Sequence, residues 1–173
     1  MAEPFDQIYE RHVWQVYAFH AYRVRSRETA EDLTQLTFER ALRAWERYDP
    51  ARASVLTWLL VIARNLLIDH ARADRSAGQV PLDTEHHGVP APPPELPGVA
   101  PPLAAALEQL NDRDREVLAL RYGADLKGPE IAEMTGLSLA NVQQILSRSL
   151  RQLRADLEDV PAGDLPTRRA SQT

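Results

Sequence analysis

The sequence predicts an all-α protein made of two small helical modules joined by a proline-rich linker. Apolar residues recur at spacings of three and four through residues 4–76 and again through residues 103–159, which places them on one face of each helix. No stretch alternates between apolar and polar residues in the way that predicts a strand. Residues 77–102 are acidic and hold eight of the 13 prolines. Because proline interrupts helices, this segment is expected to be a flexible linker.

Three or four helices are expected in the first module. The apolar spacing predicts helices over about residues 4–22, 27–48 and 55–73, and Ser26 and Ser54 are suitable N-caps for the second and third. Asp49-Pro50 ends the second helix, because the residue before a proline is pushed out of helical geometry. Trp58 is assigned to the core, since large aromatic side chains usually bury. The inward face of the second helix is expected to carry Ala30, Leu33, Leu36, Thr37, Ala41, Leu42 and Trp45.

The second module begins with a short apolar stripe at Leu103. Asn111 or Asp112 can cap the following helix, and Gly123 is suited to its end. A short helix over residues 129–135 then stops at Gly136.

A longer helix capped by Ser138 follows that glycine turn. A short helix, a glycine turn and a capped longer helix form the pattern of a helix-turn-helix. The polar residues 160–173 are expected to form a disordered tail.

The composition is that of a globular protein, with 44% hydrophobic and 26% charged residues. The chain contains no cysteine, which excludes disulfides and thiolate metal sites. No apolar run has membrane-spanning length and no secretion signal is visible, so we expect a cytoplasmic protein without membrane insertion. The net charge of −5 is unusual for a protein that coats nucleic acid on its own. Any contact with nucleic acid should therefore be local or assisted by a partner.

Enzyme motifs are missing from the sequence. There is no nucleophile elbow and no phosphate-cradling glycine loop. His86-His87 is a weak metal signal, because no further His or Cys is placed near it in the sequence. We expect no catalytic residue, no metal and no cofactor.

Three segments carry a resemblance to a known family. They read AEDLTQLTF at residues 30–38 followed by ALRAW at 41–45, WLLVIARNLLIDHAR at 58–72, and LNDRDREVLALRY at 110–122 followed by EIA at 130–132 and GLS at 136–138. In this order they resemble the extracytoplasmic-function (ECF) group of bacterial RNA polymerase sigma factors. The resemblance covers roughly residues 5–76 and 103–157. It implies a factor that directs promoter-specific transcription initiation.

The first segment is similar to the helix that docks on the clamp helices of the largest polymerase subunit in that family. The resemblance implies that Asp32, Gln35, Phe38 and Glu39 bind core RNA polymerase, which also contacts sigma factors through its second-largest subunit. Positions 32, 35 and 39 share one helical face, as docking requires. The alternative is an ordinary solvated helix face.

The second segment looks like the helix beneath the melted non-template strand of the −10 element. The resemblance implies that Arg52, Ser54, Arg64, Asn65 and Arg72 contact that strand. An amide can bond a base edge and guanidinium groups can meet phosphates, as the reading of a single strand requires. In the alternative reading, Asp69 pairs with Arg72 three residues away and Asn65 only caps or bridges backbone.

The third segment resembles the module that reads the −35 element in the major groove. The resemblance implies that the −35 contacts come from Asn141, Gln143, Gln144, Ser147, Arg148 and Arg151. Ile145 and Leu150 depart from the pattern, because arginine is common at both positions in the family. Fewer phosphate contacts should weaken duplex binding, and the added apolar surface could serve an anti-sigma partner or a tighter core.

These expectations define an initiation factor with core RNA polymerase and promoter DNA as partners and an anti-sigma factor as a further candidate. Two alternatives stay open. One is a helix-turn-helix DNA-binding transcriptional regulator. The other is a sigma-like interaction protein that does not read promoters. The helix over residues 30–45 separates the first alternative from a sigma factor, because a regulator has no need of that polar stripe.

Overall fold

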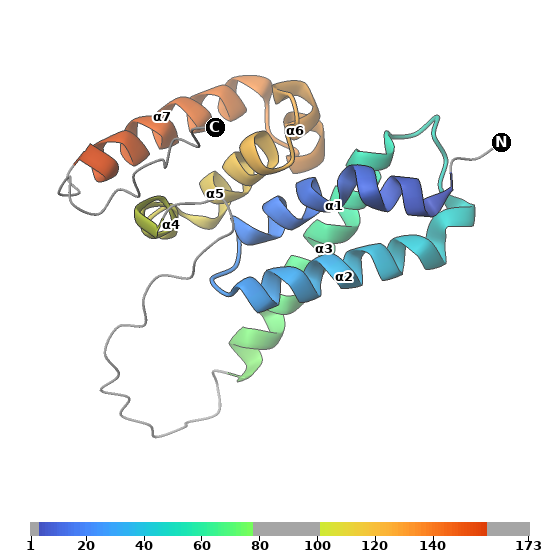
Figure 1. Ribbon diagram of the computed structural model, residues 1–173. Coiled ribbons are helices and arrows are strands. Elements are labelled where there is room, and N and C mark those ends of the chain that lie inside the picture. Colours follow the sequence, from blue (N-terminus) through green and yellow to red (C-terminus); the bar gives the residue numbers. More distant parts are fainter. Residues whose placement is uncertain (1–3, 78–100, 159–173) are drawn as a thin grey trace, which may run out of the picture.

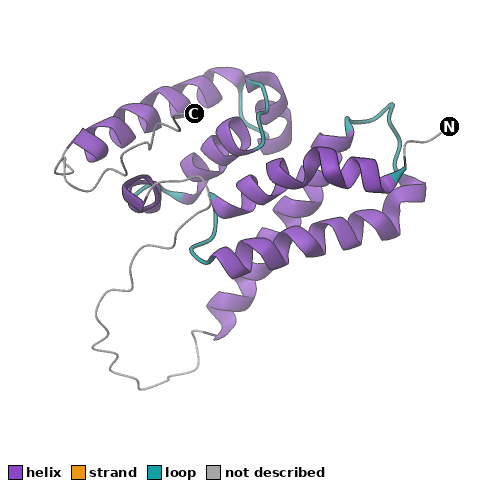
Figure 2. Cartoon of the chain, in the orientation of Figure 1, coloured by secondary structure: helices purple, strands orange, loops and turns teal. Residues whose placement is uncertain are grey.

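The protein is described by a computed structural model that covers residues 4–77 and 101–158. Every regular element in these two ranges is helical, which confirms the all-α prediction (Figure 2). Nearly all of the predicted linker (77–102) and the whole predicted tail (160–173) lie outside the described residues. None of the described helices is long and apolar enough to cross a membrane.

The first module consists of three long helices that pack against one another (Figure 1). They are α1 (Phe5–Ala21), α2 (Arg27–Ala44) and α3 (Val55–Ala77), with a 3-10 turn, η1 (Trp45–Arg47), after α2. The two predicted serine caps are confirmed. Ser26 Oγ accepts a hydrogen bond from the Thr29 amide at 3.3 Å, and Ser54 Oγ accepts one from the Thr57 amide at 3.1 Å.

A cluster of aromatic rings fixes the loop between α2 and α3. Trp45 stacks on Tyr48 with ring centroids 5.0 Å apart, and Tyr48 lies 5.1 Å from Trp58. The Tyr48 hydroxyl also donates to the Ala53 carbonyl at 2.8 Å. Trp58 is therefore a packing residue, as the sequence predicted, and it holds the loop in place.

The second module is built from four helices and a π turn. These are α4 (Pro101–Glu108), α5 (Asp112–Leu118), the π turn η2 (Ala119–Gly123), α6 (Gly128–Thr135) and α7 (Leu139–Glu158). Helix α4 begins at Pro101, inside the predicted linker, which is possible because proline is well accommodated in the first helical turn.

Three predicted helix boundaries in the second module are confirmed. Asn111 Oδ1 accepts from the Asp114 amide at 2.9 Å and caps α5. Gly136 ends α6 with a left-handed φ of 72°, and Ser138 Oγ accepts from the Asn141 amide at 3.2 Å at the start of α7. Helices α6 and α7 thus form the expected helix-turn-helix.

Two residues expected on the inward face of α2 lie outside it. Leu36 is 41% exposed and Leu42 is 57% exposed, so their assignment to the core was wrong. The face that is buried consists of Ala30, Leu33, Thr34, Thr37, Phe38 and Ala41. These positions follow the spacing of three and four strictly, whereas Leu36 and Leu42 lie beyond the edge of the stripe. The apolar character of Leu36 and Leu42 did not reveal where the buried stripe of α2 ends.

His20 of α1 and Thr37 of α2 form a buried polar pair between the two helices. His20 is completely buried, and its Nε2 lies 3.1 Å from Thr37 Oγ1. The Thr37 hydroxyl donates to the Leu33 carbonyl at 2.7 Å, so it accepts from the Nε2–H of a neutral imidazole. Burial lowers the pKa of His20 to about 3, because the interior disfavours the charged form.

The buried imidazole should make the protein less stable in mild acid. Below pH 6.5 the unfolded chain binds a proton at His20, while the folded chain does not until about pH 3. The free energy of unfolding should therefore fall by about 1.4 kcal/mol per pH unit from this group between those values. Chemical denaturation of the protein and of His20→Gln, measured from pH 7 to pH 4, gives this contribution as the difference in slope. Equal slopes would contradict it.

Candidate functional site

The polar stripe on the outer face of α2 lies where the sequence placed it. Asp32, Gln35 and Glu39 are exposed, and Gln35 Nε2 donates to Glu39 Oε1 at 3.1 Å. Phe38, in contrast, is nearly buried and packs edge-on against the rings of Phe5 and Tyr9. The stripe exposes carboxylate and amide groups to solvent. Phe38 instead packs in the core on the inner side of α2.

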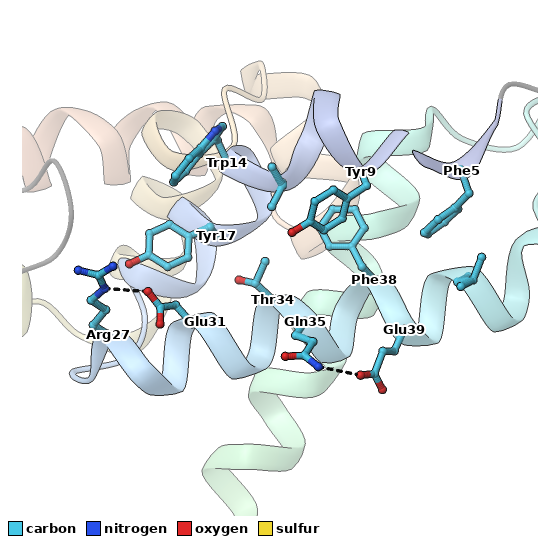
Figure 3. Close-up of a pocket in the computed structure, with 12 residues that line it drawn as sticks. Phe5, Tyr9, Trp14, Tyr17, Arg27, Glu31, Thr34, Gln35, Phe38 and Glu39 are labelled. Atoms are coloured by element: carbon cyan, nitrogen blue, oxygen red, sulfur yellow. Dashed lines mark hydrogen bonds and ion pairs between the residues drawn. The ribbon is translucent and has the colours of Figure 1, made fainter. Parts of the chain in front are cut away.

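A groove between α1 and α2 runs beside this stripe, and sequence reasoning missed it (Figure 3). It encloses about 580 Å³. Trp14 is 72% exposed at its edge, with its ring 6.1 Å from that of Tyr17. The aromatic residues lining the groove are Phe5, Tyr9, Trp14, Tyr17 and Phe38. The signal in the sequence was Trp14 itself, a large aromatic residue within the predicted helix over residues 4–22.

Charged and amide side chains line the α2 side of the groove. Arg27 Nε lies 2.7 Å from Glu31 Oε1 at one end, and the Gln35–Glu39 pair lies further along α2 (Figure 3). Burial raises the pKa of Tyr17 above its ordinary value, and the Glu31 carboxylate adds to that effect. Tyr17 is therefore a neutral phenol. The groove combines an apolar floor with a polar, largely acidic rim.

A second candidate face lies along α3. Asn65 and Arg72 are exposed and share this face with two exposed apolar residues, Val61 and Ile68. The four positions are spaced by four, three and four residues, so they form one stripe along the helix. The Asp69 carboxylate beside the stripe lies 3.7 Å from Nη1 of Arg40 on α2.

Three residues expected to contact the same strand have different surroundings. Arg52 is exposed in the loop that the Tyr48 and Trp58 rings hold. Ser54 caps α3 and also hydrogen-bonds the Thr57 hydroxyl at 2.9 Å, so its side chain is already engaged. Arg64 lies on the flank of α3 and donates from Nε to Glu116 Oε1 of the second module at 2.7 Å.

The third candidate face is the outer surface of α7. All six residues predicted to read a duplex lie on it and are exposed: Asn141, Gln143, Gln144, Ser147, Arg148 and Arg151. Arg148 donates from Nη2 to Asp114 Oδ2 at 2.6 Å, and the Asp114 side chain is only 6% exposed. Asp114 thus holds Arg148 in a fixed position at the edge of the face.

Ile145 is buried on the opposite side of α7, in the same core as Ile131 and Val142. Of the two explanations for this unusual residue, the structure favours the tighter core. An isoleucine that is buried in the free chain offers little surface to a partner.

None of the described residues forms a cluster of His, Cys, Asp or Glu that could hold a metal ion. The His86-His87 pair lies outside the described residues, so the expectation that it binds no metal stays a prediction.

Comparison with known proteins gives a consistent result. The family model Sigma-70 region 2 matches residues 8–77, and Sigma-70, region 4 matches residues 106–155. ECF RNA polymerase sigma factor BldN of Streptomyces coelicolor is 30% identical over 91% of this chain, which spans 62% of BldN. ECF RNA polymerase sigma factor SigM of Bacillus subtilis is 30% identical over 87% of this chain and 93% of SigM.

The fold is also found among solved structures. The sigma factor RpoE, solved in complex with the anti-sigma factor NepR from Bartonella quintana, superposes with a TM-score of 0.69. The match covers 91% of this chain and 98% of RpoE at 20% identity. At that identity the match shows a shared fold.

Removal of the Asp114 carboxylate should destabilise the second module. Asp114→Ala is expected to cost about 1–2 kcal/mol, because the charge-assisted bond to Arg148 is lost while the half-exposed guanidinium can still be hydrated. Asp112→Ala is the matched control, since Asp112 is exposed in the same first turn of α5. Urea denaturation should show the larger loss for Asp114→Ala, and equal losses would contradict a specific role for the Asp114–Arg148 bond.

Proposed function

The chain belongs to the extracytoplasmic-function group of RNA polymerase sigma factors, and from this premise we propose how its three faces serve promoter-specific transcription initiation. The α2 stripe binds core polymerase, the α3 face captures the melted −10 strand, and the α7 face contacts the −35 duplex. The protein acts in the cytoplasm as an initiation factor and performs no catalysis of its own.

One observation carries the polymerase assignment: the α2 stripe borders the aromatic groove, and the two share Gln35 and Glu39. Asp32, Gln35 and Glu39 are exposed, and Gln35 and Glu39 line the same groove as the largely exposed ring of Trp14. Protein interfaces commonly combine a large aromatic anchor with a polar rim in this way. Docking on the largest subunit of core polymerase explains why a surface of this kind is left open to solvent.

The composition of the α3 face suits a single strand. Val61 and Ile68 supply apolar surface for unstacked bases, Asn65 can bond a base edge, and Arg72 can meet a phosphate. Holding an extruded base offsets the cost of unpairing it, which is about a few kcal/mol per base. Arg52, in the neighbouring loop, adds a second basic group, while Ser54 contributes by capping the helix.

The α7 face suits a duplex but binds it weakly. Gln143 and Gln144 can read adenine bidentately, and Arg148 and Arg151 can contact a guanine or the phosphates. Each phosphate contact contributes a slope of about −0.9 to the dependence of log affinity on log salt concentration. With so few basic residues on the face and a net charge of −5, the free chain should bind DNA poorly. Core polymerase is then needed to bring both faces to the promoter.

An anti-sigma factor is a further candidate partner. The fold of this chain is shared with RpoE, which was solved bound to the anti-sigma factor NepR. A helix-turn-helix regulator is a weaker alternative, because it gives no reason for the region 2 match over residues 8–77. The transcription assay below distinguishes an initiation factor from an interaction protein that does not read promoters.

The decisive experiment reconstitutes transcription from core polymerase and this protein on a library of upstream sequences. Run-off products should appear from a subset of the library that shares sequence motifs near −10 and −35. The absence of a product from every template would contradict the initiation function and leave the interaction-protein alternative.

A double variant tests the docking surface. Asp32→Arg with Gln35→Ala should weaken binding to core polymerase at least tenfold, because a charge is reversed and an amide is lost at the centre of the stripe. The matched control is Glu10→Arg with Gln7→Ala, which makes the same two changes three residues apart on an exposed part of α1. Unchanged binding of the first variant, with the helical circular dichroism retained, would remove the α2 assignment.

A further inference from the structure

A cavity that belongs to none of the three candidate faces lies among helices α1, α2, α3 and α5 (Figure 1). It encloses about 340 Å³ between the loop that follows α1, the C-terminal half of α3 and the start of α5. A volume of this size lies within the range of small-molecule sites in proteins. The hydrogen-bond donors that line it are Arg23, Arg25, Arg115, Ser26, Thr29 and His70. Donors of these kinds are suited to an anion.

Two of the arginines are held in place by carbonyl groups. Arg23 donates from Nη1 to the Asp112 carbonyl. Arg115 donates from Nη2 to the carbonyls of Glu108 and Leu110, both at 3.0 Å. A carbonyl fixes the direction of a guanidinium group but carries no charge to neutralise it. Both cations are therefore positioned while their charge stays available to a ligand.

The electrostatic surroundings of Arg23 also favour an added anion. Burial lowers the pKa of Arg23, and the like charges of Arg115 and Arg64 act in the same direction. The carboxylates of Glu116 and Asp112 offset these effects only in part. The guanidinium cation is thus less favourable here than in water. A negative charge bound in the cavity would reverse this effect.

Both arginines also have an unused donor. The Nε atoms of Arg23 and Arg115 are shielded from solvent, and neither has a hydrogen-bond acceptor among the described residues. Proteins rarely leave a shielded donor unpaired unless a water, an ion or a ligand completes the bond. Two such residues lining one cavity indicate an acceptor that comes from outside the chain.

The N-terminus of α2 contributes to the same cavity. Ser26 caps this 18-residue helix, and Thr29 lies in its first turn. The positive end of a helix dipole attracts negatively charged groups, phosphate above all. Ser26 Oγ accepts from the Thr29 amide at 3.3 Å, so the hydrogen of the Ser26 hydroxyl can point to a ligand.

The rest of the lining is partly acidic and partly apolar. Asp74 and Asp112 are exposed, so water screens their charge more than it screens the shielded guanidinium groups. Asp74 also lies 3.4 Å from Nε2 of His70. Val24 and Leu67, which belong to the main apolar core, form a wall of the cavity. A ligand with an uncharged part beside its anionic group would use this wall.

We propose that this cavity binds a small phosphorylated molecule of about nucleotide size. Arg23, Arg25 and Arg115 bind the phosphate oxygens together with the Ser26 hydroxyl, and Leu67 contacts the uncharged part. The planar fork of arginine matches phosphate oxygens two at a time, which suits three arginines to this task.

Calorimetric titration of the full chain tests the site with inorganic phosphate, pyrophosphate and adenosine diphosphate. Sodium chloride keeps the ionic strength constant, so a general effect of salt does not register as binding. Adenosine diphosphate should bind at one site with a dissociation constant below about 1 mM, and more tightly than inorganic phosphate. Absence of saturable binding by all three probes would overturn the proposal, and equal affinity for inorganic phosphate and adenosine diphosphate would overturn the role of the apolar wall.

A competition experiment separates small molecules from nucleic acid as the source of the phosphate. A single-stranded oligonucleotide is added to the complex with adenosine diphosphate. The diphosphate should stay bound, because the site is a cavity and not an open face. Displacement by the oligonucleotide at lower concentration would assign these arginines to nucleic acid and overturn the proposal.

Three substitutions locate the bound phosphate. Arg23→Gln and Arg25→Gln should each weaken binding of adenosine diphosphate about tenfold, because each removes a charged donor. Arg25 is 78% exposed, so Arg25→Gln keeps the test valid if Arg23→Gln loses its helical circular dichroism. The matched control is Arg113→Gln, the same change at an exposed residue of α5 outside the cavity, which should bind as the parent does. Parent affinity in Arg25→Gln, or an equal loss in Arg113→Gln, would overturn the site.

Discussion

Helix α2 is buried on one side and exposed on the other, and the first module depends on this division. Its inner residues pack on α1 and α3, and Thr37 on that side hydrogen-bonds Nε2 of the fully buried His20. Its outer residues, Asp32 and Gln35 among them, make no contribution to that core and are exposed to solvent. Because both sets of residues lie on one helix, the proposed docking stripe is held rigidly by the same packing that stabilises the fold. Rigid presentation lowers the entropy cost of binding.

Two arginines that were expected to contact nucleic acid form ion pairs within the protein. Arg64 and Arg148, both expected to contact nucleic acid, each donate to a carboxylate of the second module. Such pairing fixes the direction of the guanidinium groups but reduces the positive potential that they offer to phosphates. Together with the net charge of −5, it supports the proposal that affinity for a promoter comes from a complex with core polymerase.

Local signals in the sequence predicted most of the fold. Ser26, Ser54, Asn111 and Ser138 could be assigned as caps because a cap depends on the few residues that follow it. The edge of the buried stripe on α2 could not be assigned, since Leu36 and Leu42 are apolar and only the position of neighbouring helices leaves them exposed. The packing of η2 on α1 is a contact between residues about 100 positions apart, and helical periodicity carries no information about it.

The candidate site, like the fold, could be predicted only in part from the sequence. The motifs located the three faces, because a helical face follows directly from sequence spacing. They did not reveal the aromatic groove or the bonds that Arg64 and Arg148 make, since these depend on how separate helices meet. The assignment of each residue to polymerase or to DNA stays a proposal, supported by its exposure and chemistry.

The placement of the three tryptophans gives the protein a built-in optical reporter. Trp45 and Trp58 lie 5.9 Å apart within the packed aromatic cluster, while Trp14 stands in water beside the groove. Indole emission shifts to shorter wavelength when water leaves the ring, so coverage of the groove would change the Trp14 component and leave that of the partly buried Trp45–Trp58 pair unchanged. A titration followed by fluorescence could then separate occupancy of the groove from unfolding of the helices, without any attached dye.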